Sequence, residues 1–222
     1  GKPIEKIVQG VHFTPQGDKA KLLESYLRQH PDERAIVFGR TKHGSEKLMK
    51  LLDSWGFAAG SIHGNKSQGQ RDRALAEFKA GRLKVLVATD VAARGIDIPM
   101  VGHVYNYDMP NVPENYVHRI GRTARAGAEG RAVAFCAPAE MDELKAIEKT
   151  MKASIPVIGG APWVGVPGAA PAKKSGRPGG SRQGQGRPGG QGKPAGEVAA
   201  FGKPKLKHSR RPNRPAGDRR AA

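Results

Sequence analysis

The chain has 222 residues and carries 38 Lys and Arg against 20 Asp and Glu, a formal net charge of +18. Residues 1–158 account for +6 of this charge and residues 159–222 for +12. Hydrophobic residues make up 37% of the chain, which is below the average of a globular domain. This distribution excludes a uniformly basic globule and an acidic solvating protein, and it predicts an ordinary domain followed by a basic tail.

Three further features limit the class of protein. No run of 18 apolar residues exists, so we expect no membrane-spanning helix and no membrane partner. The first residues lack both a Met and the apolar core of a signal peptide, and the chain reads as a fragment. The single cysteine, Cys136, lies in an apolar run and is expected to be buried and inert. A single cysteine that forms no intramolecular disulfide suits a protein of a reducing compartment, so we expect a cytoplasmic location.

Apolar runs alternate with amphipathic segments over residues 7–158. The expected strands are 7–13, 35–38, 58–62, 85–88, 101–107 and 131–135, and the expected helices are one around 22–27 and others at 43–55, 71–79, 113–120 and 139–152. Asp18 is placed to cap the first helix, and Gly81 to follow the end of the third. Strands that are apolar throughout, alternating with helices, predict a three-layer α/β domain with a mainly parallel sheet over residues 1–158.

Residues 159–222 have a different composition. They contain 15 Gly, 9 Pro and 14 Lys and Arg, with few large apolar residues. Such a segment buries too little apolar surface to offset its ordering entropy, so we expect a disordered basic tail. Its pentapeptide Gly-Arg-Pro-Gly-Gly occurs twice, which indicates low complexity. The tail has two interpretations, an RNA tether without sequence preference and a solubilising or protein-docking extension, and its charge favours the tether.

Four polar segments follow expected strands, where ligands of open α/β sheets bind. The first contains Thr41 and Gly44 at a helix start, whose free N–H groups favour phosphate, although Thr in this place is more often only a cap. The second contains Gly64, which permits close backbone approach, with Arg71 and Arg73 near another helix start. The alternative for both is a capped, solvated helix start.

The third and fourth segments carry more specific signals. A buried strand ends near Thr89 and leads through small residues to Asp97, which can accept hydrogen bonds from a ribose diol or cap its own turn. Arg122 and Arg125 lie three residues apart, on one face of a helical turn. Two adjacent guanidinium groups repel unless an anion lies between them, and their planar shape suits phosphate oxygens. The alternative is a pair of surface arginines.

Together these segments resemble a known family. The motifs are Val37-Phe38 with Arg40-Thr41-Lys42, His63-Gly64, Gln68-x-x-Arg71, Ala88-Thr89-Asp90-Val91-Ala92-Ala93-Arg94-Gly95-Ile96-Asp97 and His118-Arg119-Ile120-Gly121-Arg122-Thr123-Ala124-Arg125. In this order they resemble the second, C-terminal RecA-like domain of DEAD-box ATP-dependent RNA helicases, over residues 4–158. Residues 106–114 are similar to the bacterial RhlE-type subgroup. Asn65 departs from the Asp common at its place, which alters the local charge and removes no catalytic group.

The resemblance implies a role for each matched residue. Arg122 and Arg125 match the catalytic arginine fingers that contact the γ-phosphate of ATP. Gly95 and Asp97 match the ribose-binding segment, and Phe38 matches an aromatic that packs near the fingers. The residues that match contacts to RNA phosphates, or support them, are Thr41, Gly44, Gly64, Gln68, Arg71 and Thr89. The residues that match bridges to the first RecA-like domain are Arg94, His118 and Arg119.

Several parts of a complete helicase site are absent from the sequence. It contains no Gly-x-x-x-x-Gly-Lys-Ser/Thr phosphate loop, no Asp-Glu-Ala-Asp sequence and no recognisable upstream glutamine motif. We therefore expect the second half of an ATP-dependent RNA helicase, inactive alone, whose Mg²⁺ ligands lie in the N-terminal RecA-like domain. Its expected partners are that domain, RNA, and ribonucleoprotein or RNA-decay proteins reached through the tail. The alternative is a stand-alone RNA-binding or assembly module, but the intact finger motif favours the helicase half.

Overall fold

The structure of the chain is a computed structural model that describes residues 6–124 and 128–165. One sheet of seven parallel strands runs through this part of the chain. The strands are β1 (Ile7–Phe13), β2 (Ala35–Gly39), β3 (Ala59–Ile62), β4 (Val85–Thr89), β5 (His103–Asn106), β6 (Gly130–Cys136) and β7 (Val157–Gly159). They lie in the order β3-β4-β2-β5-β6-β1-β7. The parallel sheet predicted from the alternating pattern is confirmed.

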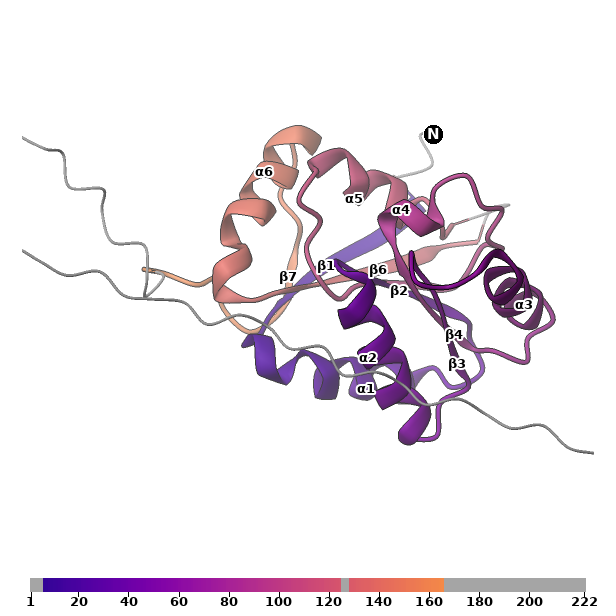
Figure 1. The fold of residues 1–222 in the computed structure, drawn as a ribbon. Helices are drawn as coiled ribbons and strands as arrows, with labels where there is room; N and C mark the ends of the chain where they lie inside the picture. The colour runs from indigo at the N-terminus through magenta and orange to yellow at the C-terminus, as the bar shows by residue number, and fades with distance from the viewer. Residues whose placement is uncertain (1–5, 125–127, 166–222) are drawn as a thin grey trace, which may run out of the picture. The chain divides into compact units, whose positions relative to one another are not determined.

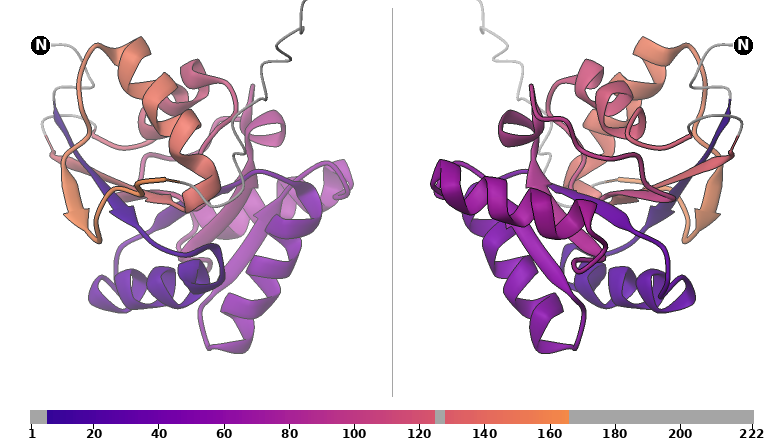
Figure 2. Two further views of the ribbon diagram at one scale, coloured as in Figure 1. Left: turned by 90° about the vertical axis from the view of Figure 1, so that its left-hand side faces the viewer. Right: turned by 90° about the vertical axis from the view of Figure 1, so that its right-hand side faces the viewer.

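Helices cover both faces of the sheet. They are α1 (Lys19–Gln29), α2 (Lys42–Ser54), α3 (Gln68–Lys79), α4 (Asp90–Ala93), α5 (Pro113–Ile120) and α6 (Met141–Met151), with the 3₁₀ helices η2 (Gln16–Asp18) and η3 (Pro138–Glu140). The helices α1 and α2 lie on one side of the sheet and α5 and α6 on the other (Figures 1 and 2). α3 packs on the same side as α5 and α6. The three-layer, RecA-like architecture predicted from the sequence is thus confirmed.

The central strands are buried on both faces because alternate residues enter two separate apolar clusters. In β2, Ala35 and Val37 join the cluster that holds Leu23 of α1, whereas Ile36 and Phe38 join the cluster that holds the residues of α5 and α6. All five residues of β2 and all five of β4 are buried. This double burial explains why these strands are continuous apolar runs in the sequence.

Three local predictions differ from the structure. Asp18 makes no capping hydrogen bond, because it belongs to η2 and has helical backbone angles itself. The strand expected over 101–107 is limited to β5, and Val101 forms only an isolated bridge to Thr123. The turn expected after Thr89 contains the short helix α4, which is too brief to leave a periodic pattern.

The packed structure continues beyond the expected domain boundary at residue 158. β7 spans that boundary and pairs with β1. Trp163 packs against the core, and its indole Nε1–H donates a hydrogen bond of 3.0 Å to the carbonyl of Cys136. One large aromatic side chain is enough to fix a short stretch of otherwise Gly- and Pro-rich chain. The remainder of the expected tail, residues 166–222, lies outside the described residues.

Two turns depend on glycines in the left-handed region. Gly81 follows the end of α3 with φ +79°, as its position predicts, and Gly95 follows α4 with φ +74°. Side chains with a Cβ rarely adopt this conformation. Gly95 therefore sets the direction in which the chain leaves α4 towards Asp97. Within residues 6–124 and 128–165, no helix has the length and apolar character needed to cross a membrane.

Candidate functional site

A cleft of about 500 Å³ lies at the carboxyl edge of the sheet, lined by α4, the loop after it and α5. Its lining includes all but one of the residues expected to bind nucleotide or to bridge to a second domain. They are Phe38, Arg94, Gly95, Asp97, His118, Arg119 and Arg122. Residues from three separate sequence motifs thus meet in one place, as ligand binding at a strand carboxyl edge predicts. The remaining one, Arg125, lies outside the described residues.

Arg122 is held at the wall of this cleft by backbone carbonyls. Its Nη1 donates to the carbonyl of Ile96 at 3.3 Å and its Nη2 to that of Ala93 at 3.2 Å. Among the described residues no carboxylate lies within ion-pair distance of this guanidinium. The carbonyls orient the side chain without neutralising it, so its charge stays available for an anionic ligand.

Arg119 lies beneath the cleft and is almost wholly buried, with 1% of its surface exposed. Its Nε and Nη2 each donate to a carboxylate oxygen of Asp90 at 2.7 Å. Its Nη1 donates to the Asn106 side chain at 3.2 Å and to the carbonyl of Asp108 at 2.6 Å. The guanidinium also lies over the ring of Phe38, 5.2 Å from its centroid. In this chain the side chain therefore holds α4 and α5 together, and its expected bridge to a second domain stays a prediction.

Three charged or polar residues of the cleft, Asp97, His118 and Arg94, are open to solvent. Asp97 is 97% exposed, and its nearest cation is Lys79 Nζ at 4.0 Å. Within the described part of the chain it makes no hydrogen bond with its own turn, so the capping alternative has no support there. His118 and Arg94 are exposed at the rim, where Arg94 donates to the Asn115 side chain at 3.4 Å. These groups are placed to meet a ligand or a second surface.

The expected RNA contacts fall into two smaller hollows at the same edge of the sheet. A hollow of about 280 Å³ is lined by Arg40, Lys42, Gly64, Arg71, Thr89, Val91 and Ala92. Another, of about 440 Å³, contains Thr41 and Gly44. Gln68 lines neither, and its amide instead donates to Asp72 at 2.9 Å. The structure therefore groups five of the six expected residues and leaves Gln68 apart.

The charges of the first hollow suit a polyanion. Lys42 and Arg71 contribute cations to its lining, whereas the guanidinium of Arg40 is paired with Glu140 at 3.4 Å and with Glu143 at 3.5 Å. The Nε of Arg71 is buried and has no hydrogen-bond partner among the described residues. A buried unsatisfied donor is costly, and a phosphate oxygen satisfies it. Thr41, in the neighbouring hollow, caps α2 by accepting a hydrogen bond of 3.0 Å from the N–H of Gly44, so its capping role is real.

Glu46 supports the segment that contains Gly64, a role that no sequence motif indicates. It accepts hydrogen bonds from Ser61 at 2.8 Å, from Lys66 at 3.0 Å and from buried His63 at 2.5 Å. The N–H of Asn65 donates to Nδ1 of His63, so the ring carries its proton on Nε2, facing Glu46. Burial would raise the pKa of Glu46, but these hydrogen bonds outweigh it and lower the pKa to about 2.

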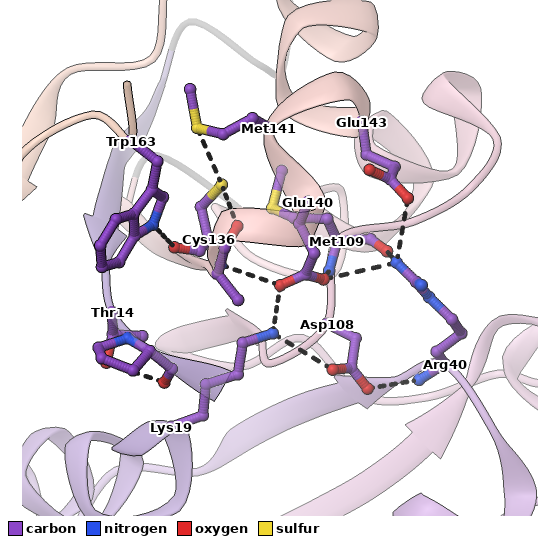
Figure 3. A network of polar contacts seen from close by, with 12 residues as sticks. Thr14, Lys19, Arg40, Asp108, Met109, Cys136, Glu140, Met141, Glu143 and Trp163 are labelled. Atoms are coloured by element: carbon purple, nitrogen blue, oxygen red, sulfur yellow. Dashed lines mark hydrogen bonds and ion pairs between the residues drawn. The ribbon is translucent and has the colours of Figure 1, made fainter. Parts of the chain in front are cut away.

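A second feature that the sequence did not indicate is a buried ionic network around Lys19. Figure 3 shows the Lys19 ammonium between the carboxylates of Glu140 and Asp108, the latter at 3.3 Å. Asp108 also accepts a bond of 2.9 Å from the N–H of Arg40, and the Arg40 guanidinium donates to the carbonyl of Met109 at 2.9 Å. Lys19 precedes Leu23 by four residues, so the helical period itself places it on the buried stripe. This network fixes the loops that follow β2, β5 and β6.

Comparison with known proteins agrees with the fold and the motifs. The model of the helicase conserved C-terminal domain matches residues 18–127. The chain is 48% identical over 160 residues to the ATP-dependent RNA helicase CshA of Listeria monocytogenes, and 57% identical over 173 residues to the DEAD-box helicase CshA of Bacillus licheniformis. These matches cover 72% and 68% of this chain but only 30% and 36% of those relatives, so the chain spans about a third of their length.

Solved structures give the same result at domain level. The E. coli DEAD-box protein SrmB, bound to the regulator of ribonuclease activity A, is 39% identical with a TM-score of 0.65 over 68% of this chain and 89% of that one. The C-terminal domain of the DEAD-box protein Dbp5 is 34% identical with a TM-score of 0.65 over 70% and 92%.

The parallel sheet and its cleft at the carboxyl edge define a RecA-like domain. The chain belongs to the DEAD-box RNA helicase family, and the part that matches is the C-terminal helicase domain. The resemblance to the RhlE-type subgroup stays a prediction, since the relatives above are named CshA.

Proposed function

We propose that this chain acts as the second half of an ATP-dependent RNA helicase and supplies Arg122 to ATP held against the first RecA-like domain. The observation that carries the proposal is the placement of Arg122, oriented by two carbonyls and unpaired with any described carboxylate. In NTPases an arginine finger accelerates phosphoryl transfer by about 10³–10⁵. Arg125, assigned the same task by its motif, lies outside the described residues.

The lining of the cleft fits part of a nucleotide. The exposed carboxylate of Asp97 can accept hydrogen bonds from both ribose hydroxyls, and Gly95 leaves open space beside it. Bound ATP supplies the γ-phosphoryl group, and Arg122 stabilises the charge that develops on it. Asp90 is unsuited to hold Mg²⁺, because both of its carboxylate oxygens accept hydrogen bonds from Arg119. We therefore assign the Mg²⁺ ligands to the first RecA-like domain.

RNA would lie along the two hollows at the carboxyl edge. Lys42 and Arg71 offer donors to phosphate oxygens, and Gly64 lets a backbone approach closely. Contacts of this kind hold the sugar–phosphate backbone and read no sequence. The basic segment 166–222 would add a tether for RNA, and for ribonucleoprotein or RNA-decay proteins.

Closure of the two RecA-like domains would couple the two ligands. Each ligand contacts both domains, so each favours closure and raises the affinity for the other. The exposed rim residues Arg94 and His118 are the side chains placed to meet the first domain. A cytoplasmic location is part of this proposal and is supported by the single cysteine, Cys136, which has no partner for an intramolecular disulfide in this sequence. Its burial raises the pKa of the thiol to about 12 and keeps it unreactive.

The test compares ATP hydrolysis by this chain alone and by a fusion to the N-terminal part of the CshA of Bacillus subtilis. We expect no RNA-stimulated turnover from the chain alone and clear RNA-stimulated turnover from the fusion. Turnover by the chain alone would overturn the division of the ATP site. A fusion that binds RNA but hydrolyses no ATP would favour the alternative, a stand-alone RNA-binding or assembly module.

A further inference from the structure

Three side chains with metal-binding donor atoms meet at the amino edge of the sheet. His30 follows the last residue of α1, Glu33 lies in the turn before β2, and His103 is the first residue of β5. Their donor atoms all lie within 4.8 Å of one another. His30 Nδ1 is 3.2 Å from Glu33 Oε2, and His103 Nε2 contacts the same oxygen.

The close packing of the two imidazole rings disfavours protonation of both rings at once. Their centroids are 4.2 Å apart with an interplanar angle of 31°. Two imidazolium ions at this separation repel each other, whereas one divalent ion can accept a lone pair from each ring and from the carboxylate together. Two His and one carboxylate form a donor set that proteins use for Zn²⁺, with a fourth position left for water.

Exposure and support differ among the three ligands in a way that suits a metal site. Glu33 and His30 are reachable from solvent, so an ion can enter without unfolding the domain. His103 is buried and its ring is stacked on that of Tyr105, which fixes one ligand in place. Arg131 is in register with His103 on β6 and its charge opposes a cation, so we expect affinity on the order of micromolar rather than that of a closed structural zinc site.

The cluster is also remote from the cleft. The cluster includes the first residue of β5. Asn106, which supports Arg119, is the last residue of that strand, and Asp108, which supports Arg40, follows it. At about 3.3 Å per residue, the three steps from His103 to Asn106 span about 10 Å. Occupation of the cluster therefore does not compete with ligands at the carboxyl edge.

We propose that His30, Glu33 and His103 form a binding site for a divalent transition-metal ion, with Zn²⁺ as the best fit. The bound ion would join the end of α1 to the start of β5. Because these segments are more than 70 residues apart in the sequence, a ligand that binds only the folded state stabilises the domain as a whole.

The test titrates the metal-free 222-residue chain with Zn²⁺, followed by calorimetry and by thermal unfolding. We expect one Zn²⁺ per chain at this site and a rise in Tm of about 5–10 °C when Zn²⁺ exceeds its Kd a hundredfold. Co²⁺ serves as a second probe, and its visible absorption should show coordination by nitrogen and oxygen ligands. Glu33→Gln and His30→Asn should each weaken Zn²⁺ binding by at least about 100-fold.

The control is His43→Asn, which removes an exposed histidine on α2 outside the cluster and should bind Zn²⁺ as the unmodified chain does. His103→Ala is avoided because its loss also removes a packed ring. The proposal is overturned if the chain takes up no Zn²⁺ at millimolar concentration. It is equally overturned if both Glu33→Gln and His30→Asn bind Zn²⁺ as tightly as the control.

Discussion

Arg119 and Asp90 show how a charge is kept inside this domain. The two parallel hydrogen bonds between them, with the acceptors Asn106 and Asp108, satisfy a guanidinium that solvent does not reach. The buried pair need not stabilise the fold relative to an apolar pair of the same shape, but loss of one partner leaves the other charge unpaired. Because Asp90 belongs to α4 and Arg119 to α5, the intact pair also sets the position of α4 beside the cleft.

We therefore expect Arg119→Met to lower the free energy of unfolding by about 3–5 kcal/mol, measured by urea denaturation of the chain. The matched control is Arg82→Met, which breaks an exposed pair with Glu77 and should cost about 0–1 kcal/mol. A loss from Arg119→Met no larger than that of the control would contradict the role assigned to the buried pair.

Glu46 makes the stability of the domain depend on pH. Its pKa in the folded state is about 2, against an ordinary value of 4.5, because the hydrogen bonds from His63, Ser61 and Lys66 outweigh its burial. A carboxyl whose pKa is lowered by folding stabilises the fold above its unfolded pKa and loses that contribution as the pH falls. The contribution should disappear between about pH 4.5 and pH 2.

Glu46→Gln should accordingly reduce the free energy of unfolding by about 1–3 kcal/mol at neutral pH and flatten its dependence on pH in that window. Urea denaturation at pH 7, 4.5 and 3 measures both effects. An equal fall in stability on acidification in the variant and in the unmodified chain would show that other carboxyls are responsible.

At the residue scale, the sequence predicted the residues that line the cleft, but it did not predict the buried polar residues that hold them in place. Asp97, Gly95 and Arg122 lie together as predicted because each follows the carboxyl end of a parallel strand or the helix beside it. The burial of Arg119 and its contacts with Asp90 could not be predicted, because a sequence motif gives residue types and spacing but not depth. Glu46 and Glu140 were missed because their partners lie far away in the chain.

Among the elements, α4 has a position that connects the two candidate surfaces. Asp90 and Ala93 of this helix line the cleft, whereas Val91 and Ala92 line the hollow that also holds Arg71. Arg122 donates to the carbonyl of Ala93, so the candidate finger is attached to the same short helix. The helix α4 is therefore a direct physical connection between the cleft and this hollow.

The start of α2 allows its two predicted roles, helix cap and RNA contact, to be separated. Thr41→Ser and Thr41→Asp both keep a side-chain acceptor for the N–H of Gly44, so both should leave the free energy of unfolding within about 0.5 kcal/mol. Only Thr41→Asp places a negative charge in the hollow, and it should weaken RNA binding about tenfold or more. Equal RNA affinity in the two variants would leave Thr41 with the capping role alone.

The elements themselves were largely predictable. Long apolar runs such as β2 and β4 and regular stripes such as that of α2 are strong signals, and they lie where the sequence places them. The elements that the sequence did not predict are short. The helix α4 has four residues and the strand β7 has three, which is too few for a helical or strand periodicity to be recognised. Their stability comes from tertiary contacts, which a single sequence does not display.

At the scale of the whole molecule, the net charge divides between a packed domain and a basic segment. The segment's proposed task is a tether for RNA. If it neutralises roughly six phosphates, log K for RNA should fall with log salt at a slope of about −4. The truncation that tests this begins at residue 166, because β7 and Trp163 belong to the packed domain.

Removal of residues 166–222 should flatten that slope and leave Tm nearly unchanged. Removal of residues 159–222 should in addition lower Tm, because it cuts β7 and removes the Trp163 contact to the carbonyl of Cys136. RNA binding by filter retention across a range of salt, with thermal unfolding of both truncated chains, gives the two readouts. An unchanged slope would favour a protein-docking or solubilising extension.

The central claim is that Arg122 acts on ATP as part of a two-domain enzyme, and its most direct test is Arg122→Ala in the fusion to a first RecA-like domain. RNA-stimulated ATP turnover should fall by about 10³ or more, while RNA binding without nucleotide changes less than about twofold. Arg122→Lys keeps the charge but loses the planar fork, and it should also be strongly impaired. Normal turnover in Arg122→Ala would contradict the account.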